Sequence, residues 1–227
     1  MLWKTYCWDM RLLWRYGLIP VALIIALLYV LIMLNLPESG YEQVVAFFIL
    51  SDPTMIGFIF IGVMILFEKD ANTIQALVVS PLPAHLYLIS KIAAFTTLGL
   101  IAGLMMAVIS QADFNYLFII LAILLTSVIF TSIGFVGVAR VKTFNQYIIV
   151  IPVFLAPLCL PFLGYWQILD SWFFYVIPTQ ACIILFQASY ETVPLWQLYY
   201  AIIYSIICIA FLYKLCIYSF IKNFING

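Results

Sequence analysis

The sequence predicts an all-α integral membrane protein, and two features of its composition and pattern support this prediction. Of the 227 residues, 67% are hydrophobic and 8% are charged, whereas about 25% of the residues in a water-soluble protein are charged. Apolar runs recur that reach the roughly 20 residues a helix needs to span a hydrocarbon core of about 30 Å. The alternating pattern of a membrane β-barrel does not occur. We therefore expect one transmembrane domain over residues 1–227, with six transmembrane helices.

Residues 1–17 predict an amphipathic helix that lies in the membrane interface. Its cations share one helical arc, and its apolar side chains recur at spacings of three and four on another: Lys4, Arg11 and Arg15 against Trp3, Cys7, Met10 and Trp14. Such a helix places its apolar face in the lipid and its cations among the headgroups. The alternative is a cleavable signal peptide, but the apolar run that follows is too long and lacks a small-x-small cleavage site.

Six transmembrane helices are expected after this segment. Their approximate ranges are 18–36, 43–67, 92–110, 116–139, 146–163 and 196–221. Two of them carry signals that break or bend a helix. Residues 51–53, Ser-Asp-Pro, interrupt the second, and the fifth contains Pro152, Pro157 and Pro161. Because proline removes a backbone hydrogen bond, we expect both helices to depart from a straight α-helix.

Residues 171–188 are apolar enough to form a seventh crossing, but the distribution of charge argues against it. With six crossings and a cytoplasmic N-terminus, all nine Lys and Arg residues lie in cytoplasmic segments or within snorkelling reach of them. The acidic residues then expected on the outer side are Glu38, Glu42, Asp113, Asp170 and Glu191. A seventh crossing would move Lys214 and Lys222 to the outer side. We therefore expect a re-entrant helical hairpin, broken at Pro178, that dips in from the outer face, and a cytoplasmic C-terminus.

Composition and motifs exclude several classes of function. The formal net charge is zero, which excludes nucleic acid as the main partner because nucleic-acid binding needs a basic surface. The five cysteines are scattered through apolar runs and are interpreted as small buried hydrophobic residues rather than as disulfides or metal ligands. The sequence contains no P-loop and no H-E-x-x-H motif. We therefore expect no enzymatic activity, cofactor or metal in this chain.

The polar stretch between the second and third apolar runs, residues 67–91, carries four of the eighteen charged side chains. Its local signals predict a short helix, because Asn72 and Gln75 have the spacing of a capping box and Pro81 ends the segment. The apolar side chains that share one face of this helix are Ile74, Leu77, Val78 and Pro81. Such a helix is suited to docking against a partner. The alternative is that it packs against its own bundle or against the lipid surface.

The order of residues in this stretch resembles that of the membrane subunit of bacterial ABC-2 type exporters. In that family the second span ends in a Glu-basic pair, followed by a polar turn, a T/I-x-x-A-L helix, a V/T-S-P-L turn and a Lys that opens the third span. The matching positions here are Glu68-Lys69-Asp70, Thr73 to Leu77, Val79 to Leu82, and Lys91. The chain departs from the family in having Ala71 and Asn72 where many relatives carry a glycine in the turn.

The resemblance covers the whole chain, since the family also has an N-terminal interfacial helix, six spans and outer re-entrant helices. Tyr175-x-x-Pro178 resembles a late motif of the same family. The resemblance implies that residues 68–91 form a cytoplasmic coupling segment whose helix docks in a groove of a separate ATP-binding cassette ATPase subunit. The coupling residues that it implies are Glu68, Lys69, Asp70, Thr73, Ile74, Gln75, Leu77, Val78, Pro81 and Leu82.

As a permease of this family, the chain is expected in the bacterial plasma membrane, in contact with membrane lipid, as a homodimer or as a heterodimer with a similar permease. ATP and Mg²⁺ belong to the partner ATPase. The expected substrate is a hydrophobic or amphipathic small molecule, such as a drug, an antibiotic or a lipid-like compound. The second and fifth helices are the expected path-lining or interface helices. Their candidate polar or gating residues are Asp52, Pro53, Pro152, Pro157 and Pro161.

Asp52 has two interpretations, because a carboxylate in an apolar span is costly unless it is paired, protonated or in contact with water. In the first interpretation, Asp52 is a substrate-binding or gating residue. In the second, it caps the inner half of a broken helix, with Pro53 at the first helical position. Glu68 is expected to pair with Lys69, Lys91 or Arg140.

Three other functions stay open at this point. They are a haem-exporter-like subunit for cytochrome maturation, a proton-coupled secondary transporter that uses Asp52, and a membrane protein that does not transport. Gly99 and Gly103, spaced as G-x-x-x-G, are interpreted as packing residues within the subunit.

Overall fold

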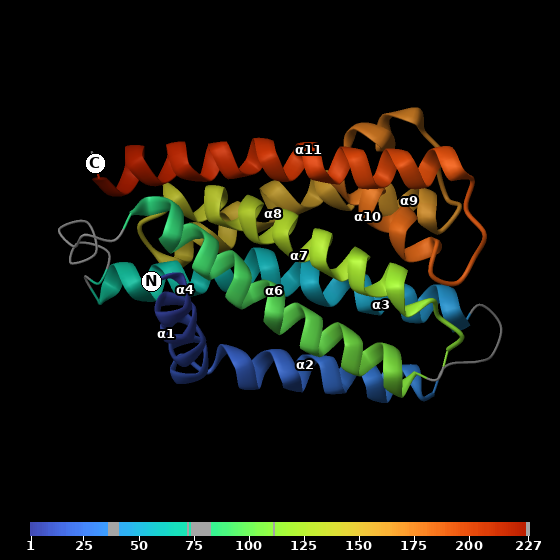
Figure 1. The fold of residues 1–227 in the computed structure, drawn as a ribbon, viewed down its shortest axis with the longest axis horizontal. Coiled ribbons are helices and arrows are strands. Elements are labelled where there is room, and N and C mark those ends of the chain that lie inside the picture. The colour runs from blue at the N-terminus through green and yellow to red at the C-terminus, as the bar shows by residue number, and fades with distance from the viewer. Residues whose placement is uncertain (36–40, 72, 74–82, 111, 226–227) are drawn as a thin grey trace.

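A computed structural model describes residues 1–35, 41–71, 73, 83–110 and 112–225, and the regular elements in this part of the chain are all helices. Figure 1 shows the long helices running along one axis, with the first helix lying across them at the end where both chain termini lie. We call this the α1 end and the opposite one the α10 end.

The first two helices form an angle rather than a single rod. Helices α1 (Leu2–Arg15) and α2 (Leu18–Met33) are bent by 68° relative to each other. Gly17 makes the bend with a left-handed backbone, φ +75°, a conformation that glycine adopts without steric cost. Leu13 packs into the bundle, whereas Trp3 and Trp14 are exposed on α1. This exposure suits the predicted interfacial helix, whose place in a membrane stays a prediction.

The second predicted span is one helix of 30 residues, Tyr41–Asp70. It consists of α3 (Tyr41–Met55), a π-helix η1 (Ile56–Phe60) and α4 (Ile61–Asp70). The predicted interruption at residues 51–53 is therefore wrong, because the helix continues through Pro53. Ser51 Oγ and Thr54 Oγ donate hydrogen bonds of 2.8 Å to the carbonyls of the preceding turn, which keeps their hydroxyls satisfied inside the helix. The departure from α-helical geometry lies in η1, shortly after Pro53.

The remaining long helices follow the predicted order. They are α6 (Ala84–Ile109), α7 (Tyr116–Ala139), α8 (Phe144–Cys159), the short α9 (Pro161–Tyr165) and α11 (Leu195–Phe220), which continues as the π-helix η3 (Ile221–Ile225). Within the described residues, five helices are long and apolar enough to cross a membrane, or six if the bent pair α1 and α2 counts as one span. The chain is thus a multi-pass helical membrane protein.

Helix α7 lies at the centre of the bundle and packs against α3, α4, α6, α10 and α11. Glycines allow α6 to approach its neighbours closely. A Cβ atom on Gly99 would lie 2.7 Å from Ser127 Oγ and 3.3 Å from Pro53 Cβ, and one on Gly103 would lie 2.7 Å from Ile123 Cδ1. The prediction that these two glycines serve packing within the subunit is confirmed.

The segment between α9 and α11 contains a 3-10 helix, η2 (Trp172–Val176), and the ten-residue helix α10 (Pro178–Gln187). Ten helical residues extend about 15 Å, half of a membrane core. The backbone N–H of Asn115, at the start of α7, donates to the Ser189 carbonyl over 2.7 Å, so α10 ends where α7 begins. The segment enters and leaves at the same end of the bundle, which is the geometry that the re-entrant prediction requires. Its depth in a membrane stays a prediction.

Candidate functional site

A buried cluster of charged side chains joins three helices at the α1 end. Lys91 of α6 is fully buried, and its Nζ atom lies 2.6 Å from Glu68 Oε1 of α4 and 3.1 Å from Asp9 Oδ1 of α1. A lysine is almost never fully buried unless it is paired. The expected pairing of Glu68 with Lys91 is confirmed, and Lys91 lies within the helix rather than at its start.

Two further side chains complete what we call the ionic cluster: Asp9, Glu68, Tyr87, Ser90 and Lys91. The Tyr87 hydroxyl donates a hydrogen bond of 2.6 Å to Glu68 Oε2, and the Ser90 hydroxyl donates to Asp9 Oδ2. The Lys91 ammonium also lies 4.6 Å from the centre of the Tyr87 ring, within the range of a cation–π contact. Every oxygen of the two carboxylates therefore has a donor, which is what makes a buried charge tolerable.

Sequence reasoning missed Asp9. Asp9 and Leu13, one turn apart, are the buried residues of α1 and lie on the arc that faces the bundle. The available signal was a single acidic residue in a helix whose other charges are all positive, on the arc that also contains Leu13. An acid at such a position has to find a cation in the neighbouring helix, because it faces other helices rather than water.

Lys69, the residue after Glu68, is bound to a different helix. Its Nζ atom lies 3.1 Å from the carbonyl oxygen of Val138, 3.3 Å from that of Ala139 and 2.5 Å from that of Val141. These carbonyls belong to the last turn of α7 and the residues after it, where helix carbonyls lack partners and favour a cation. Lys69 Nζ also lies 4.8 Å from the centre of the Phe224 ring. Its predicted contact with a partner subunit stays a prediction, since within the chain its ammonium is already bound.

Glu68 and Lys69 thus attach the end of α4 to α1, α6, α7 and the C-terminal η3 at one point. Asp70 ends α4 and is exposed, and Thr73 is half-buried. The predicted coupling helix follows directly. Its other predicted residues, Ile74, Gln75, Leu77, Val78, Pro81 and Leu82, lie outside the described residues.

Asp52 lies in the middle of the long helix, in α3. It is buried, and neither carboxylate oxygen has a hydrogen-bond partner among the residues that the structure describes. The capping interpretation is wrong, because the helix is continuous and Pro53 lies inside it. A role of Asp52 in gating or substrate binding stays a prediction.

The prolines of the fifth span lie where they were expected. Pro152 and Pro157 are inside α8 and exposed, and Pro161 is buried at the first position of α9. Their predicted role in bending stays a prediction. A missed contact on α8 is that of Tyr147, which is buried against the α3–η1–α4 helix.

The α10 end has its own polar contacts. Tyr165 and Gln43 of α3 bond reciprocally: the Tyr165 hydroxyl donates to the Gln43 carbonyl over 2.6 Å, and Gln43 Nε2 donates to the Tyr165 carbonyl over 2.9 Å. The hydroxyl oxygens of Tyr165 and Tyr190 lie 3.0 Å apart. Burial raises the pKa of Tyr190 to about 12, so this hydroxyl stays protonated at any physiological pH. Of the two predicted re-entrant residues, Tyr175 lines a cavity at this end and Pro178 begins α10.

Comparisons with known proteins agree on one kind of protein. The whole chain, residues 1–227, matches the family model described as the Fluoroquinolones export permease protein family. Two proteins named as fluoroquinolones export permease proteins, from the CDC 1551 / Oshkosh and H37Rv strains of Mycobacterium tuberculosis, are each 28% identical to it over 209 residues. These alignments cover 89% of this chain and 87% of each relative. No solved structure matches the chain.

Proposed function

The chain belongs to the fluoroquinolones export permease protein family, an ABC-2 type permease family, and from this premise we propose that it exports a hydrophobic or amphipathic small molecule. The observation that carries the proposal is the match to the family over all 227 residues. The names of the two mycobacterial relatives suggest an antibiotic of the fluoroquinolone class as the substrate.

The energy for export is proposed to come from a separate ATP-binding cassette subunit. The sequence has no P-loop, and a chain without this phosphate-binding loop does not hydrolyse ATP by this route. ATP and Mg²⁺ would bind in the partner. The predicted coupling helix, through Ile74, Leu77 and Val78, would fill a groove of that subunit.

The contacts of Glu68 and Lys69 support this mechanism. A movement of the coupling segment pulls on α4, and α4 is bound to α6 and α1 through Lys91 and to α7 through Lys69. A force from the partner on α4 would therefore be transmitted to α1, α6 and α7 as well. Two such subunits, identical or similar, would enclose the transport path between them. In the plasma membrane, the α1 end would face the cytoplasm.

The test begins with the partner. The tagged protein is purified in mild detergent from its native host, as wild type and as the double variant Leu77→Asp, Val78→Asp. The matched control, Lys142→Asp with Asn145→Asp, places two aspartates in residues 142–146, an exposed segment at the α1 end. We expect a P-loop ATPase to co-purify with the wild type and the control but not with the coupling-helix variant.

The second half of the test measures transport. Inverted membrane vesicles that contain the complex should take up norfloxacin when ATP is added, and the coupling-helix variant should not. Co-purification without ATP-dependent uptake would reject the drug-export function but keep the ATPase partner. If wild type brings down no ATPase while other membrane complexes survive the same detergent, the ATP-driven mechanism is wrong.

A further inference from the structure

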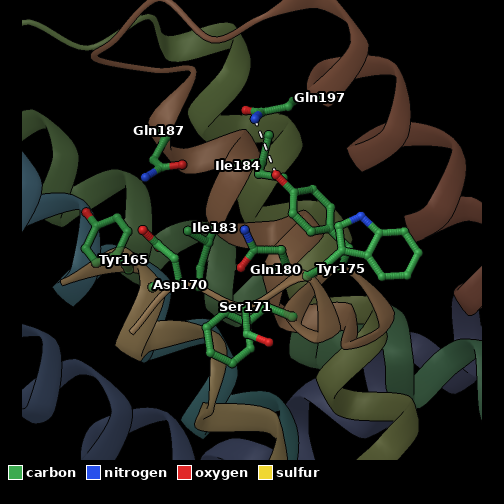
Figure 2. A pocket seen from close by; sticks show the side chains of 12 residues that line it. Tyr165, Asp170, Ser171, Tyr175, Gln180, Ile183, Ile184, Gln187 and Gln197 are labelled. Carbon is green, nitrogen blue, oxygen red and sulfur yellow. Dashed lines mark hydrogen bonds between the residues drawn. The ribbon is translucent and has the colours of Figure 1, made fainter. Parts of the chain in front are cut away.

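A cavity of about 420 Å³ lies at the α10 end, between α9, η2, α10 and the start of α11. Small-molecule sites in proteins have volumes of about 300–1,000 Å³ and combine apolar walls with a few polar groups. Figure 2 shows Asp170 and Gln180 between the rings of Tyr165 and Tyr175, with Gln187 beside them. The cavity lies far along the bundle from the ionic cluster and shares no residue with it.

The charge at this end favours a cation. Among the described residues, Asp170 is the only charged one that lines the cavity. The described residues 41–50, 112–122 and 160–200, which surround this end, also contain Glu42, Asp113 and Glu191 and no Lys, Arg or His. A site with one carboxylate, surrounded by further acids, attracts the positively charged group of a ligand.

Aromatic rings form much of the wall. The Tyr175 ring stacks on Trp196, with 5.9 Å between the ring centres and 25° between their planes. Phe174 is buried in the lining, while Trp172 is exposed at the cavity. Aromatic faces bind flat aromatic molecules by stacking and organic cations through their π electrons.

The amide groups add a specific acceptor. Gln180 Oε1 is buried, and no described residue donates a hydrogen bond to it. An unpaired buried carbonyl is costly, so a ligand N–H that reaches it gains a full hydrogen bond. A protonated amine has such N–H groups and would meet Asp170 in the same cavity. Gln197 Nε2 is already used, since it donates to the Tyr175 hydroxyl over 3.3 Å.

The walls are fixed in place before any ligand binds. Tyr165 is held by the reciprocal hydrogen bonds with Gln43. On the other side, the hydroxyls of Tyr200 and Tyr204 donate to the carbonyls of Tyr175 and Val176 and hold η2 against α11. A site with rigid walls loses little conformational entropy on binding.

We propose that this cavity binds planar aromatic molecules that carry a protonated amine. Asp170 pairs with the ammonium, Gln180 Oε1 accepts one of its N–H groups, and Tyr175 lies against the aromatic body. The identification of this ligand with an exported substrate rests on the proposed function. Binding itself does not, because it requires neither ATP nor a partner.

The experiment measures equilibrium binding of norfloxacin to the purified full-length protein in detergent. Its matched probe is N-acetylnorfloxacin, which keeps the aromatic body but lacks the basic amine. We expect wild type to bind norfloxacin at least about tenfold more tightly than the acetylated probe, as the loss of a charged hydrogen bond predicts. Asp170→Asn should remove this preference and weaken norfloxacin binding about tenfold.

Two further variants test whether a loss of norfloxacin binding is specific to the cavity. Asp113→Asn removes an exposed acid at the same end that does not line the cavity, and it should bind norfloxacin as wild type does. Gln180→Met should weaken norfloxacin binding and leave the thermal melting point within a few degrees of wild type. If Asp170→Asn binds both probes with the affinities of wild type, the cavity is not the binding site for these molecules. The same conclusion follows if wild type binds neither probe, or binds both probes with equal affinity.

Transport by the same variants in inverted vesicles separates the two proposals. ATP-dependent uptake by wild type together with unchanged binding by Asp170→Asn rejects the cavity and keeps export. Amine-selective binding that Asp170→Asn abolishes, without any ATP-dependent uptake by wild type, keeps the cavity and rejects export.

Discussion

The Tyr147 hydroxyl donates a hydrogen bond of 2.6 Å to the carbonyl oxygen of Phe58. Phe58 lies in the π-helix η1, where the backbone hydrogen bonds join residues five positions apart rather than four. Tyr147 of α8 supplies a donor at this position, and both residues are buried. The contact therefore joins the fifth span to the irregular part of the second.

Replacing Tyr147 by Phe should lower stability with little change in packing. The variant removes this buried hydrogen bond to the Phe58 carbonyl, and the net contribution of such a bond to stability is about 0.5–1.5 kcal/mol. We expect a lower thermal melting point for the purified protein in detergent. Tyr41→Phe is the control, since the Tyr41 hydroxyl also donates to a carbonyl, that of Ser110, but is only part-buried. An equal loss in both variants would contradict a special role for the η1 contact.

Gly62→Ala should be more damaging than Tyr147→Phe. A Cβ atom at residue 62 would lie 2.0 Å from Cζ of Tyr147, so the ring would have to leave its place and with it the bond to Phe58. Gly137→Ala is the matched control, because its Cβ would lie 3.6 Å from the nearest atom, Val150 Cγ1. Folded yield and melting point are the measurements. Adding Tyr147→Leu to Gly62→Ala should recover part of the loss, and no recovery would show that another clash is responsible.

Lys91→Met should destabilise the protein strongly, because it leaves the carboxylates of Asp9 and Glu68 buried without their cation. Breaking a buried pair on one side costs about 3–5 kcal/mol. The triple variant Lys91→Met, Glu68→Gln, Asp9→Asn removes all three charges and should regain most of the melting temperature. Its ATP-dependent transport should stay low, because the ionic link between α4 and α1 is still missing. Full transport by the triple variant would mean that these charges serve stability alone.

Asp52→Asn should raise stability and lower transport. The carboxylate is buried and has no partner among the described residues, so the neutral amide of the same shape avoids the cost of burying a charge. Residues whose removal stabilises a protein are often retained for function. The measurements are melting temperature and vesicle uptake, with ATPase co-purification as the control for assembly. A more stable variant with normal uptake would assign Asp52 no role in transport.

The sequence predicted the elements whose signals are local. Helix α7 has the predicted bounds, 116–139, because Asn115 caps its start, where its side chain accepts a hydrogen bond from the Leu117 N–H, and the apolar run ends at Arg140. The pair Glu68–Lys91 was also predictable, since two opposite charges at the ends of adjacent spans have few other partners. Family membership followed from the motif around Glu68 together with the order of the spans.

The errors concern features that depend on neighbouring helices. Residues 51–53 predict a helix break in water, but in a packed membrane helix the hydroxyls of Ser51 and Thr54 bond to the preceding turn and the helix continues. The contact of the π-helix η1 with Tyr147 joins residues that are 89 positions apart in the sequence. The place of Asp9 in the ionic cluster depends on the 68° bend at Gly17, which turns α1 across the bundle. No local pattern contains this information.

The π-helix has a consequence for the two halves of the second span. One extra residue in a turn shifts the angular position of everything after it by about 100° relative to an uninterrupted α-helix. Residues of α3 and α4 that appear to share a stripe on a helical wheel therefore point in different directions, and Asp52 and Glu68 cannot be placed on one face by counting. Deleting one residue within 56–60 would restore regular geometry and rotate the whole of α4, with Glu68 and Lys69, away from both of their partners. The angular setting of the end of α4, with Glu68 and Lys69, is thus fixed by five residues near the middle of the span.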